Sequence, residues 1–545
     1  MFNNKNKLGE AIMDYVIVGG GAAGCLLAER LSRDKSCQVT LIEAGTSDRN
    51  PLIHIPAGIL ALMRSKRFNW SLYTEPQSEL NQRQLFWPRG KTLGGSSSIN
   101  AMCYTRGQQA DFDHWADVLG CDDGNIRWGY QDLLPHFKGM ESFEAGANFW
   151  HGDNGPLNVQ ALRCFNPLSA AYLIAGQQFG LPLNGDFNGA VQAGVGAYHV
   201  MQRNGSRCSS AKAFLDPAYH RDNLTVITKA QVQRLKLRKQ QVCGVYYQVA
   251  GLDLYLPVAG EVILAAGALH SPQILMLSGI GPEKALAEQG INVHHKLEGV
   301  GQNLQDHLDI SVSWLEKGRR GISLNPLFWP RGLKGVLDYQ NRTGVLTSNF
   351  AEAGAFLATD TDHSRPDIQH HFIPALEVNH GLNLTPTFRH FGYTLRACLL
   401  RPKSRGYIGL RSSNAADAPR LQPCYLAEPE DMAGMIRALD SARELLNQPE
   451  MARFGRKEWL PGKICQTRAD KEAYIRQYAE SIYHPVGTCK MGQDDKAVVN
   501  LALQVHGIDN LRVVDASVMP TLVSGNTTAA TLAIASKAAE IIVGT

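Results

Sequence analysis

The chain has 545 residues, enough for two or three hydrophobic cores, and its 44% hydrophobic and 19% charged content is typical of a globular enzyme. The 54 basic and 50 acidic residues leave a net charge of +4, and because no long basic run occurs, nucleic acid is not an expected partner. No uninterrupted apolar stretch reaches the ~18 residues that a membrane-spanning helix needs.

The N-terminal residues, Met1 to Ile12, lack the apolar core of a signal peptide and precede the first predicted strand. We expect them to form a mobile extension, and we expect the protein to be cytoplasmic. The 11 cysteines fit a reducing compartment, because their number is odd and they are scattered without a Cys-x-x-Cys pair. Their spacing predicts free thiols and no metal site.

A glycine-rich turn between a predicted strand and a predicted helix is the first functional signal. Residues 13–18 read as a buried strand, and Gly19, Gly21 and Gly24 then follow the pattern G-x-G-x-x-G. These glycines permit the tight turn, the approach of backbone to a pyrophosphate, and close packing of helix on strand. A second strand, residues 38–43, ends at Glu43, about 20 residues after the last glycine, where an acid can bind ribose hydroxyls. These features favour an ADP-containing dinucleotide over an ordinary glycine turn and leave NAD and FAD open.

Downstream segments fall into two groups. The apolar, proline-containing segment 51–63 predicts a buried loop or a short helix. Further strands are predicted at residues 224–228, 261–267 and 510–515, whereas residues 160–200 are expected to be rich in loops. Between residues 310 and 470, strand patterns such as 367–372 and 407–411 indicate an antiparallel sheet with helices.

These patterns predict a mixed α/β fold, in which a Rossmann-like cofactor domain carries an inserted antiparallel-sheet substrate domain. The predicted cofactor domain comprises residues 13–160, 201–310 and 471–545, with the catalytic residues in its last part. The predicted substrate domain comprises residues 161–200 and 311–470.

Four segments resemble signatures of the glucose–methanol–choline (GMC) family of flavin oxidoreductases, and the resemblance covers nearly the whole chain. They are FWPRGKTLGGSSSIN at 86–100, GALHSPQILMLSGIG at 267–281, VGQNLQDH at 300–307 and HPVGTCKMG at 484–492. Within the family, residues 81–90 and 184–189 are similar to bacterial choline-dehydrogenase-like enzymes that oxidise aliphatic primary alcohols. The resemblance implies FAD rather than NAD as the cofactor.

The resemblance places residues 93–102 beside the flavin ring, where small residues allow close approach and amide N–H groups stabilise negative charge. Ile99 stands where some family members carry a histidine that tethers FAD, which implies that FAD is bound without a covalent bond. Val232 matches a residue whose backbone touches adenine, although a buried core valine is an equal alternative. The other cofactor-binding residues that the resemblance implies are Gly94, Asn100, Ala101, Met102, Asp515, Ala516 and Thr527, the last at the start of a predicted helix over 527–542.

Two residues match the catalytic pair of the family. His484 corresponds to the catalytic histidine, and a neutral histidine is a suitable base near neutral pH. The alternative for His484 is a hydrogen-bonded core histidine. Asn526 matches the second position, where an amide donor can hold the substrate oxygen. The alternative for Asn526 is a helix N-cap, a position that favours asparagine.

Three other residues receive structural interpretations. Glu352 could face a substrate, but a solvated or salt-bridged glutamate is the favoured reading. Asp306 and His307 are expected to support loop structure rather than to perform chemistry. A hydrolase is not indicated, because the chain lacks a G-x-S-x-G elbow with a downstream acid and base.

The resemblance therefore implies FAD-dependent oxidation of a primary, aliphatic alcohol to its aldehyde, with electrons passing to a quinone. An alcohol oxidase that uses oxygen, a choline dehydrogenase, and a lyase or decarboxylase on the same scaffold are the alternatives. A quinone acceptor would be met at the cytoplasmic membrane, so peripheral membrane contact is a further expectation. Residues 329–336 could form the contact patch, although an ordinary surface loop is the favoured reading.

Overall fold

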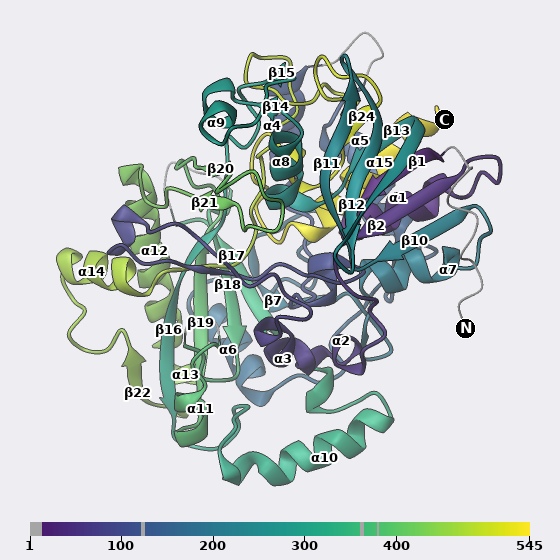
Figure 1. The fold of residues 1–545 in the computed structure, drawn as a ribbon. Helices are drawn as coiled ribbons and strands as arrows, with labels where there is room; N and C mark the ends of the chain where they lie inside the picture. The colour runs from purple at the N-terminus through teal and green to yellow at the C-terminus, as the bar shows by residue number, and fades with distance from the viewer. Residues whose placement is uncertain (1–12, 121–125, 360–364, 379–380, 545) are drawn as a thin grey trace.

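The computed structural model describes residues 13–120, 126–359, 365–378 and 381–544, so the expected extension at residues 1–12 lies outside the described residues. Two seven-stranded sheets organise these residues (Figure 1). One sheet has a parallel core and the other is antiparallel, which confirms the predicted mixed α/β class. The domain boundaries given above remain a prediction.

The parallel part of the first sheet has the strand order β10-β2-β1-β13-β24. Its strands are β1 (Met13–Val18), β2 (Val39–Glu43), β10 (Leu224–Thr228), the long β13 (Leu252–Leu264) and β24 (Leu511–Val513). All five residues of β2 are buried, as expected for a parallel strand that is covered on both faces. The outer part of β13 pairs with a meander formed by β11 (Ala230–Arg238) and β12 (Gln241–Val249).

Helices from distant parts of the chain cover this sheet. The first helix, α1 (Ala22–Leu31), packs on the last, α15 (Thr528–Val543), which also packs on α5 (Tyr130–Met140). Nearby lie α4 (Gln109–Leu119) and α8 (Gly267–Leu277), the latter against β11. The first and last helices of the chain thus share one layer beside the sheet (Figure 1).

The second sheet has the order β22-β16-β19-β18-β17-β7, with β23 paired to β16, and every pairing is antiparallel. Its strands are β7 (Gly194–Ala197), β16 (Leu308–Glu316), β17 (Ala353–Leu357), β18 (Ile368–Ile373), β19 (Gly392–Leu399), β22 (Gly455–Leu460) and β23 (Glu480–Ser481). On one face α12 (Pro429–Leu446) packs on β19 and β16, and α6 (Pro167–Gln178) packs on β7 and β17. The central strands β17, β18 and β19 are fully buried.

The described residues also form eight further α-helices and five two-stranded pairs. They are α2 (Pro51–His54), α3 (Ile59–Arg64), α7 (Asp216–Ala218), α9 (Glu283–Glu288), α10 (Trp329–Gln340), α11 (Thr385–Arg389), α13 (Pro449–Phe454), α14 (Arg468–Tyr478), and the strand pairs β3 (Leu72–Tyr73) with β4 (Phe86–Trp87), β5 (Glu141–Phe143) with β6 (Leu157–Val159), β8 (Gln202–Arg203) with β9 (Ser206–Arg207), β14 (Ile280–Gly281) with β15 (His295–Lys296) and β20 (Tyr407–Gly409) with β21 (Arg420–Gln422). No helix in the described ranges is long and apolar enough to cross a bilayer.

Two local predictions were wrong. The loop expected at residues 329–336 is part of helix α10. The predicted strand at 407–411 pairs only with β21 and lies outside the antiparallel sheet. Helix α10 carries a proline in its first turn, where proline is tolerated. Residues 160–200 are rich in loops, as expected, and also contain the twelve-residue helix α6. The segment 51–63 forms short helices, as predicted.

Candidate active site

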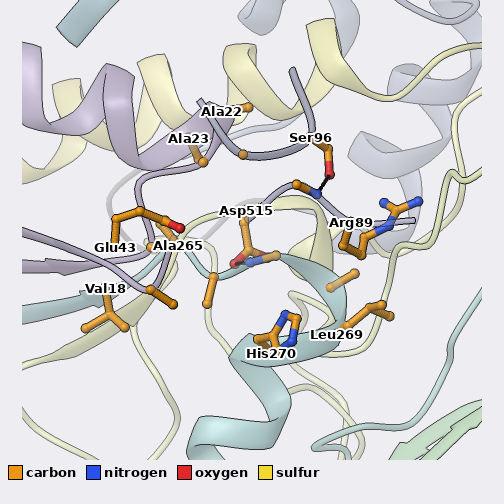
Figure 2. A pocket seen from close by; sticks show the side chains of 18 of the residues that line it. Val18, Ala22, Ala23, Glu43, Arg89, Ser96, Ala265, Leu269, His270 and Asp515 are labelled. Carbon is orange, nitrogen blue, oxygen red and sulfur yellow. Dashed lines mark hydrogen bonds between the residues drawn. The ribbon is translucent and has the colours of Figure 1, made fainter. Parts of the chain in front are cut away.

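A cavity lies at the carboxyl ends of the parallel strands, which is where open α/β sheets bind ligands (Figure 2). We call it the cofactor cavity. Its lining includes Gly19 after β1, Glu43 at the end of β2, Gly267 after β13 and Asp515 after β24. In Figure 2, Val18 and Glu43 lie toward one end of this cavity, and Ser96 and Arg89 lie toward the other.

The glycines of the turn are required by close backbone contacts. Gly19 has a φ of +107°, and a Cβ there would lie 2.6 Å from the carbonyl oxygen of Ala265. A Cβ at Gly24 would lie 1.9 Å from the carbonyl oxygen of Gly19. Gly24 therefore does not line the cavity but holds α1 against the turn, whereas Gly21 lines the cavity at the start of that helix. The backbone N–H groups at this helix start suit an anion.

Glu43 is fixed by the backbone of the glycine turn. Its carboxylate accepts hydrogen bonds from the N–H of Gly20 at 2.8 Å and of Gly45 at 2.6 Å. Burial raises the pKa of this carboxyl to about 7, although the two backbone donors and Lys91 act in the opposite direction. The side chain faces the cavity and can accept hydrogen bonds from hydroxyl groups of a ligand (Figure 2).

Val232, Asp515, Ala516 and Thr527 all line the same cavity. Asp515 is also structural, because its carboxylate accepts from the N–H of Gly267 at 2.8 Å and from the hydroxyl of Ser271 at 2.6 Å, at the start of α8. Helix α15 begins at Thr528, with Thr527 as its N-cap. Asn526 therefore precedes the cap, so the N-cap alternative for this asparagine was wrong.

The remaining residues that were predicted to bind the cofactor do not line the cofactor cavity. Gly94 does not line the cavity, but its N–H donates to the carbonyl of Gly20 at 2.7 Å and ties the two glycine segments together. Asn100, Ala101 and Met102 line a second cavity, which also contains Ile99, His484 and Asn526 and which we call the catalytic cavity. The two cavities adjoin, since both are lined by Arg89, Ser96, Thr527 and Thr528.

The predicted catalytic pair meets in the catalytic cavity. Nε2 of His484 lies 3.2 Å from Nδ2 of Asn526, although 42 residues separate them in the chain. Burial and the neighbouring His307, His371 and Arg89 hold the pKa of His484 well below its usual range. The imidazole is therefore neutral at pH 7, as a general base must be.

The hydrogen-bond partners of His307 determine which nitrogen of His484 carries the proton. Nε2 of His307 lies 2.9 Å from the carbonyl oxygen of Leu400, which only accepts, so this nitrogen is the donor. Burial lowers the pKa of His307 to about 4, so its ring is neutral and its Nδ1 accepts. Nδ1 of His484, 2.9 Å away, must then be the protonated nitrogen. The other ring nitrogen of His484, Nε2, is then unprotonated, and its lone pair faces Asn526 and the cavity.

The contacts of Asn526 lead to the same tautomer. Its Oδ1 accepts from the hydroxyl of Thr105 at 3.0 Å and from Nε2 of Gln369 at 3.3 Å. The Thr105 hydroxyl is itself fixed, because it accepts from the backbone N–H of Asn526 at 2.8 Å. The NH₂ group of Asn526 is thus turned toward His484, and a donor there needs an unprotonated Nε2. The unprotonated Nε2 of His484 and the NH₂ group of Asn526 therefore lie next to each other in the catalytic cavity.

Asp306 supports the backbone beside His484. Its carboxylate is buried and accepts from the N–H of His484 at 2.7 Å and from the hydroxyls of Ser481 and Tyr425. Tyr483, just before His484, has a φ of +72°, a conformation that is unfavourable for a bulky residue. Asp306 and His307 therefore position the segment that carries His484, and their expected loop-supporting role has a direct link to the catalytic cavity.

Residue His371 was not predicted as a site residue. Residues 369 and 371 share one face of β18, so Gln369 contacts Asn526 while His371 lines the catalytic cavity and stacks on Tyr198. His370 points the other way, to Ser441 of α12. Burial lowers the pKa of His371 to about 4, so it also is neutral. Polar residues spaced by two in a buried strand were the available signal.

Glu352 differs from its prediction. It is fully buried, and its carboxylate accepts from the hydroxyls of Ser169 and Ser348, each at 2.7 Å, and from the N–H of Asn166 at 2.7 Å. Burial raises its pKa. The solvated or salt-bridged reading was therefore wrong: this carboxyl joins α6 to the loop before β17.

A third cavity of about 550 Å³ adjoins the catalytic cavity, and we call it the apolar cavity. It is lined by Phe328, Leu333, Leu346, Phe350, Leu376 and Leu384 among other apolar residues. Six residues line both cavities: Ile59, Met63, Ala101, Ala351, Ile373 and Glu377. Glu377 is the only acid among the described residues of the catalytic lining, and Nη1 of Arg396 lies 3.2 Å from its carboxylate.

Comparison with known proteins gives consistent results over nearly the whole chain. Residues 13–309 and 402–535 match the two domain models of the GMC oxidoreductase family. An alcohol dehydrogenase [acceptor] from Pseudomonas putida is 47% identical over 97% of this chain and 95% of its own. A mitochondrial choline dehydrogenase from Homo sapiens is 40% identical over 97% and 89% of the two chains. An oxygen-dependent choline dehydrogenase from Cronobacter sakazakii is 38% identical over 97% and 95%.

Solved structures show the same fold. Pyridoxine 4-oxidase from Mesorbium loti aligns with a TM-score of 0.87 and 34% identity over 97% of this chain and 98% of its own. An FAD-dependent oxidoreductase from Chaetomium thermophilum aligns with a TM-score of 0.86 and 26% identity over 97% and 99%. The glycine turn, the acid at the end of β2 and the helix start fit FAD, which is the cofactor. The chain therefore belongs to the GMC oxidoreductase family.

Proposed function

We propose that this enzyme oxidises primary, aliphatic alcohols to aldehydes. One observation carries the proposal: an unprotonated imidazole nitrogen and an amide donor, 3.2 Å apart, face a cavity that adjoins the cofactor cavity. A hydroxyl placed beside both groups in the cavity can donate its proton to His484 Nε2 and accept from Asn526 Nδ2. The similarity to an alcohol dehydrogenase [acceptor] supports the same reaction.

The chain supplies positioning and proton transfer. When bound, FAD supplies the hydride acceptor at its N5 atom. His484 takes the hydroxyl proton, and Asn526 donates to the oxygen while negative charge develops on it. The alcohol thereby loses one proton and one hydride and becomes an aldehyde. Asp306 and His307 hold the backbone and the tautomer of His484 during this transfer.

The cofactor residues proposed to hold FAD are Gly19, Gly21, Glu43, Val232, Asp515, Ala516 and Thr527 in the cofactor cavity, with Gly24 and Gly94 shaping the turn and Asn100 to Met102 extending into the catalytic cavity. FAD is held without a covalent bond, because Ile99 carries no nucleophile. Acid precipitation should leave the yellow colour in the supernatant. Flavin that stays on the precipitated chain would contradict the proposal.

An apolar alcohol suits the site better than choline. A quaternary ammonium group would need a free carboxylate or an aromatic cage, but Glu377, the one acid that the described residues contribute to the catalytic lining, pairs with Arg396. Next to that lining, the apolar cavity offers room for an alkyl chain. We therefore place medium-chain alkanols ahead of choline, although choline dehydrogenases are among the relatives.

The electron acceptor is proposed to be a quinone that the enzyme meets at the cytoplasmic face of a membrane. The relative named for an unspecified acceptor supports a partner other than NAD. The test is anaerobic stopped-flow reduction of the flavin by ethanol, hexan-1-ol, decan-1-ol and choline, followed by reoxidation with a soluble quinone or with oxygen. Failure of every alcohol to reduce the flavin would overturn the proposed reaction. Faster reoxidation by oxygen than by quinone would show an oxidase.

A further inference from the structure

Helix α10 turns an apolar face to solvent instead of to the core. Trp329, Leu333, Val336 and Leu337 recur at helical spacing, and their exposed fractions are 60%, 70%, 56% and 63%. Only Gly335 of this helix is buried. In Figure 1, α10 lies along the edge of the molecule on the side of the antiparallel sheet, away from the parallel one. An outward apolar stripe of this size marks an interaction surface.

The segments around α10 are basic. Residues 59–67, 326–342 and 381–389 all contribute to the lining of the apolar cavity. Together they contain seven Lys or Arg and a single acid, Asp338, whereas the whole chain has a net charge of only +4. Leu327, Leu382 and Phe388, also in these segments, are exposed apolar side chains. An apolar stripe with basic flanks complements the surface of an anionic phospholipid bilayer.

The same helix forms part of a cavity wall. Phe328, Trp329, Gly332 and Leu333 line the apolar cavity, so residues of the exposed stripe also reach its interior. This cavity adjoins the catalytic cavity through shared residues such as Met63 and Ala351. The α10 surface and the space beside His484 are thus connected by a lining whose shared residues are apolar except for Glu377, which is paired with Arg396.

We propose that α10 docks the enzyme on an anionic phospholipid bilayer, and that the apolar cavity receives the alkyl chain of a primary alcohol directly from that bilayer. The docking surface and the substrate entrance are then one structure. A long-chain alcohol, which partitions into lipid, enters beside Leu333 with its hydroxyl toward His484 and Asn526. This inference rests on the proposed alcohol oxidation, but it concerns the route and the surface rather than the reaction.

The first experiment tests docking. FAD-loaded enzyme is sedimented with phosphatidylcholine vesicles that contain or lack phosphatidylglycerol. The double variant Leu333→Ser, Leu337→Ser should lose about tenfold or more of its binding to anionic vesicles, since bound apolar area and charge set the affinity. Ile464→Ser, which removes an 88% exposed side chain outside these segments, should bind as the parent does.

Parental binding by the double variant, or equal binding of the parent to neutral and anionic vesicles, would overturn the docking proposal. Light scattering adds a separate check. If the parent is a dimer that the double variant converts to monomer without a change in vesicle binding, the stripe joins two copies of the chain and the proposal is wrong.

The second experiment tests the entrance. A Cβ at Gly332 would meet only the ring of Phe328, at 4.0 Å, so Gly332→Phe adds a side chain to the cavity lining without a clash at its Cβ. This variant should lower the rate of flavin reduction by hexadecan-1-ol in vesicles, relative to the rate with butan-1-ol, by about tenfold or more because the long chain loses buried contacts. Parental rates with hexadecan-1-ol would overturn the entrance. If butan-1-ol fails to reduce the parent flavin, the proposed reaction fails instead, and vesicle binding still tests the surface.

Discussion

In the parallel-sheet half, the cofactor cavity is shaped mainly by glycine, alanine and backbone groups. In the catalytic cavity, polar side chains from separate segments form the hydrogen bonds that position His484 and Asn526. Gly19 and Gly24 fit only because they lack a Cβ, and Glu43 is held by two backbone N–H groups. His484 and Asn526, in contrast, are held by side chains such as those of His307 and Thr105. Substitutions in the backbone-built cofactor cavity should therefore reduce FAD binding through steric clashes. Substitutions of the side chains in the catalytic cavity should instead slow flavin reduction.

The largest expected effect is at Gly24. In Gly24→Ala the new methyl group would lie 1.9 Å from the carbonyl oxygen of Gly19, so the turn and α1 must separate. We expect loss of bound FAD and of soluble protein, measured by flavin absorbance per chain and by thermal unfolding. Gly139→Ala in α5 is the matched control: no atom lies within 4 Å of its Cβ, so it should be neutral or stabilising by up to about 1 kcal/mol. Full FAD content in Gly24→Ala would contradict the claim that the glycine turn depends on the missing Cβ at this position.

His484→Ala should slow flavin reduction without reducing the amount of bound FAD. Loss of a general base typically slows a reaction by about 10²–10⁴-fold, while FAD content should stay at the parental level. Stopped-flow flavin reduction and the flavin-to-protein ratio measure the two properties independently. Asn526→Ala should slow reduction by a smaller factor, since one of several contacts to the oxygen is lost. Parental rates in both variants would show that this pair is not catalytic.

Glu43→Gln should weaken FAD binding without slowing flavin reduction in the FAD-saturated enzyme. A hydrogen bond to a charged group contributes about 1.5–3 kcal/mol, or roughly ten- to hundredfold in affinity. Because burial raises the pKa of Glu43 to about 7, the carboxylate protonates as pH falls below 7, and FAD binding by the parent apoprotein should weaken over that range. Isothermal titration between pH 6 and 8 measures this, and the glutamine variant should lack the dependence. An equal slope in both proteins would exclude Glu43.

His307→Leu should slow flavin reduction by about tenfold, which corresponds to about 1.4 kcal/mol and to one net hydrogen bond. The expected cause is that Nδ1–H of His484 loses its acceptor, so that the tautomer and ring orientation are less fixed. His307→Gln, which keeps an acceptor oxygen, should recover part of the rate. If leucine and glutamine give the same rate, the ring is held by packing and not by this hydrogen bond.

The smallest expected effect is that of pH on the parent. The pKa of His484 lies well below 6.5 because burial and three neighbouring cations or imidazoles disfavour its charged form. The base is thus fully neutral above pH 6.5, and the rate of flavin reduction should be constant from pH 6.5 to 8 and fall only at lower pH. Stopped-flow measurements across this range test it. An apparent pKa at or above 6.5 for loss of activity would contradict the buried, neutral histidine.

The strand–turn–helix unit of the parallel sheet, with its glycine turn, was predictable from the amino-acid sequence alone. Residues 13–24 and 38–43 form a local unit in which Gly24 packs against Gly19 and Glu43 accepts from Gly20 and Gly45, so spacing alone was informative, although Gly19 also contacts the distant Ala265. The family resemblance added FAD and pointed to His484 and Asn526, but it could not give their geometry.

The contact between His484 and Asn526 and the exposed face of α10 could not be predicted from the sequence, because both depend on tertiary packing. Asn526 contacts Thr105 and Gln369, and His484 contacts His307, all across more than 100 residues of chain. Glu352 and residues 329–336 were misread for the same reason: burial of a carboxyl and exposure of an apolar helix depend on which distant segments pack against them. Local sequence reports periodicity and turn chemistry, whereas the surroundings of a side chain are set by packing between segments remote in the chain.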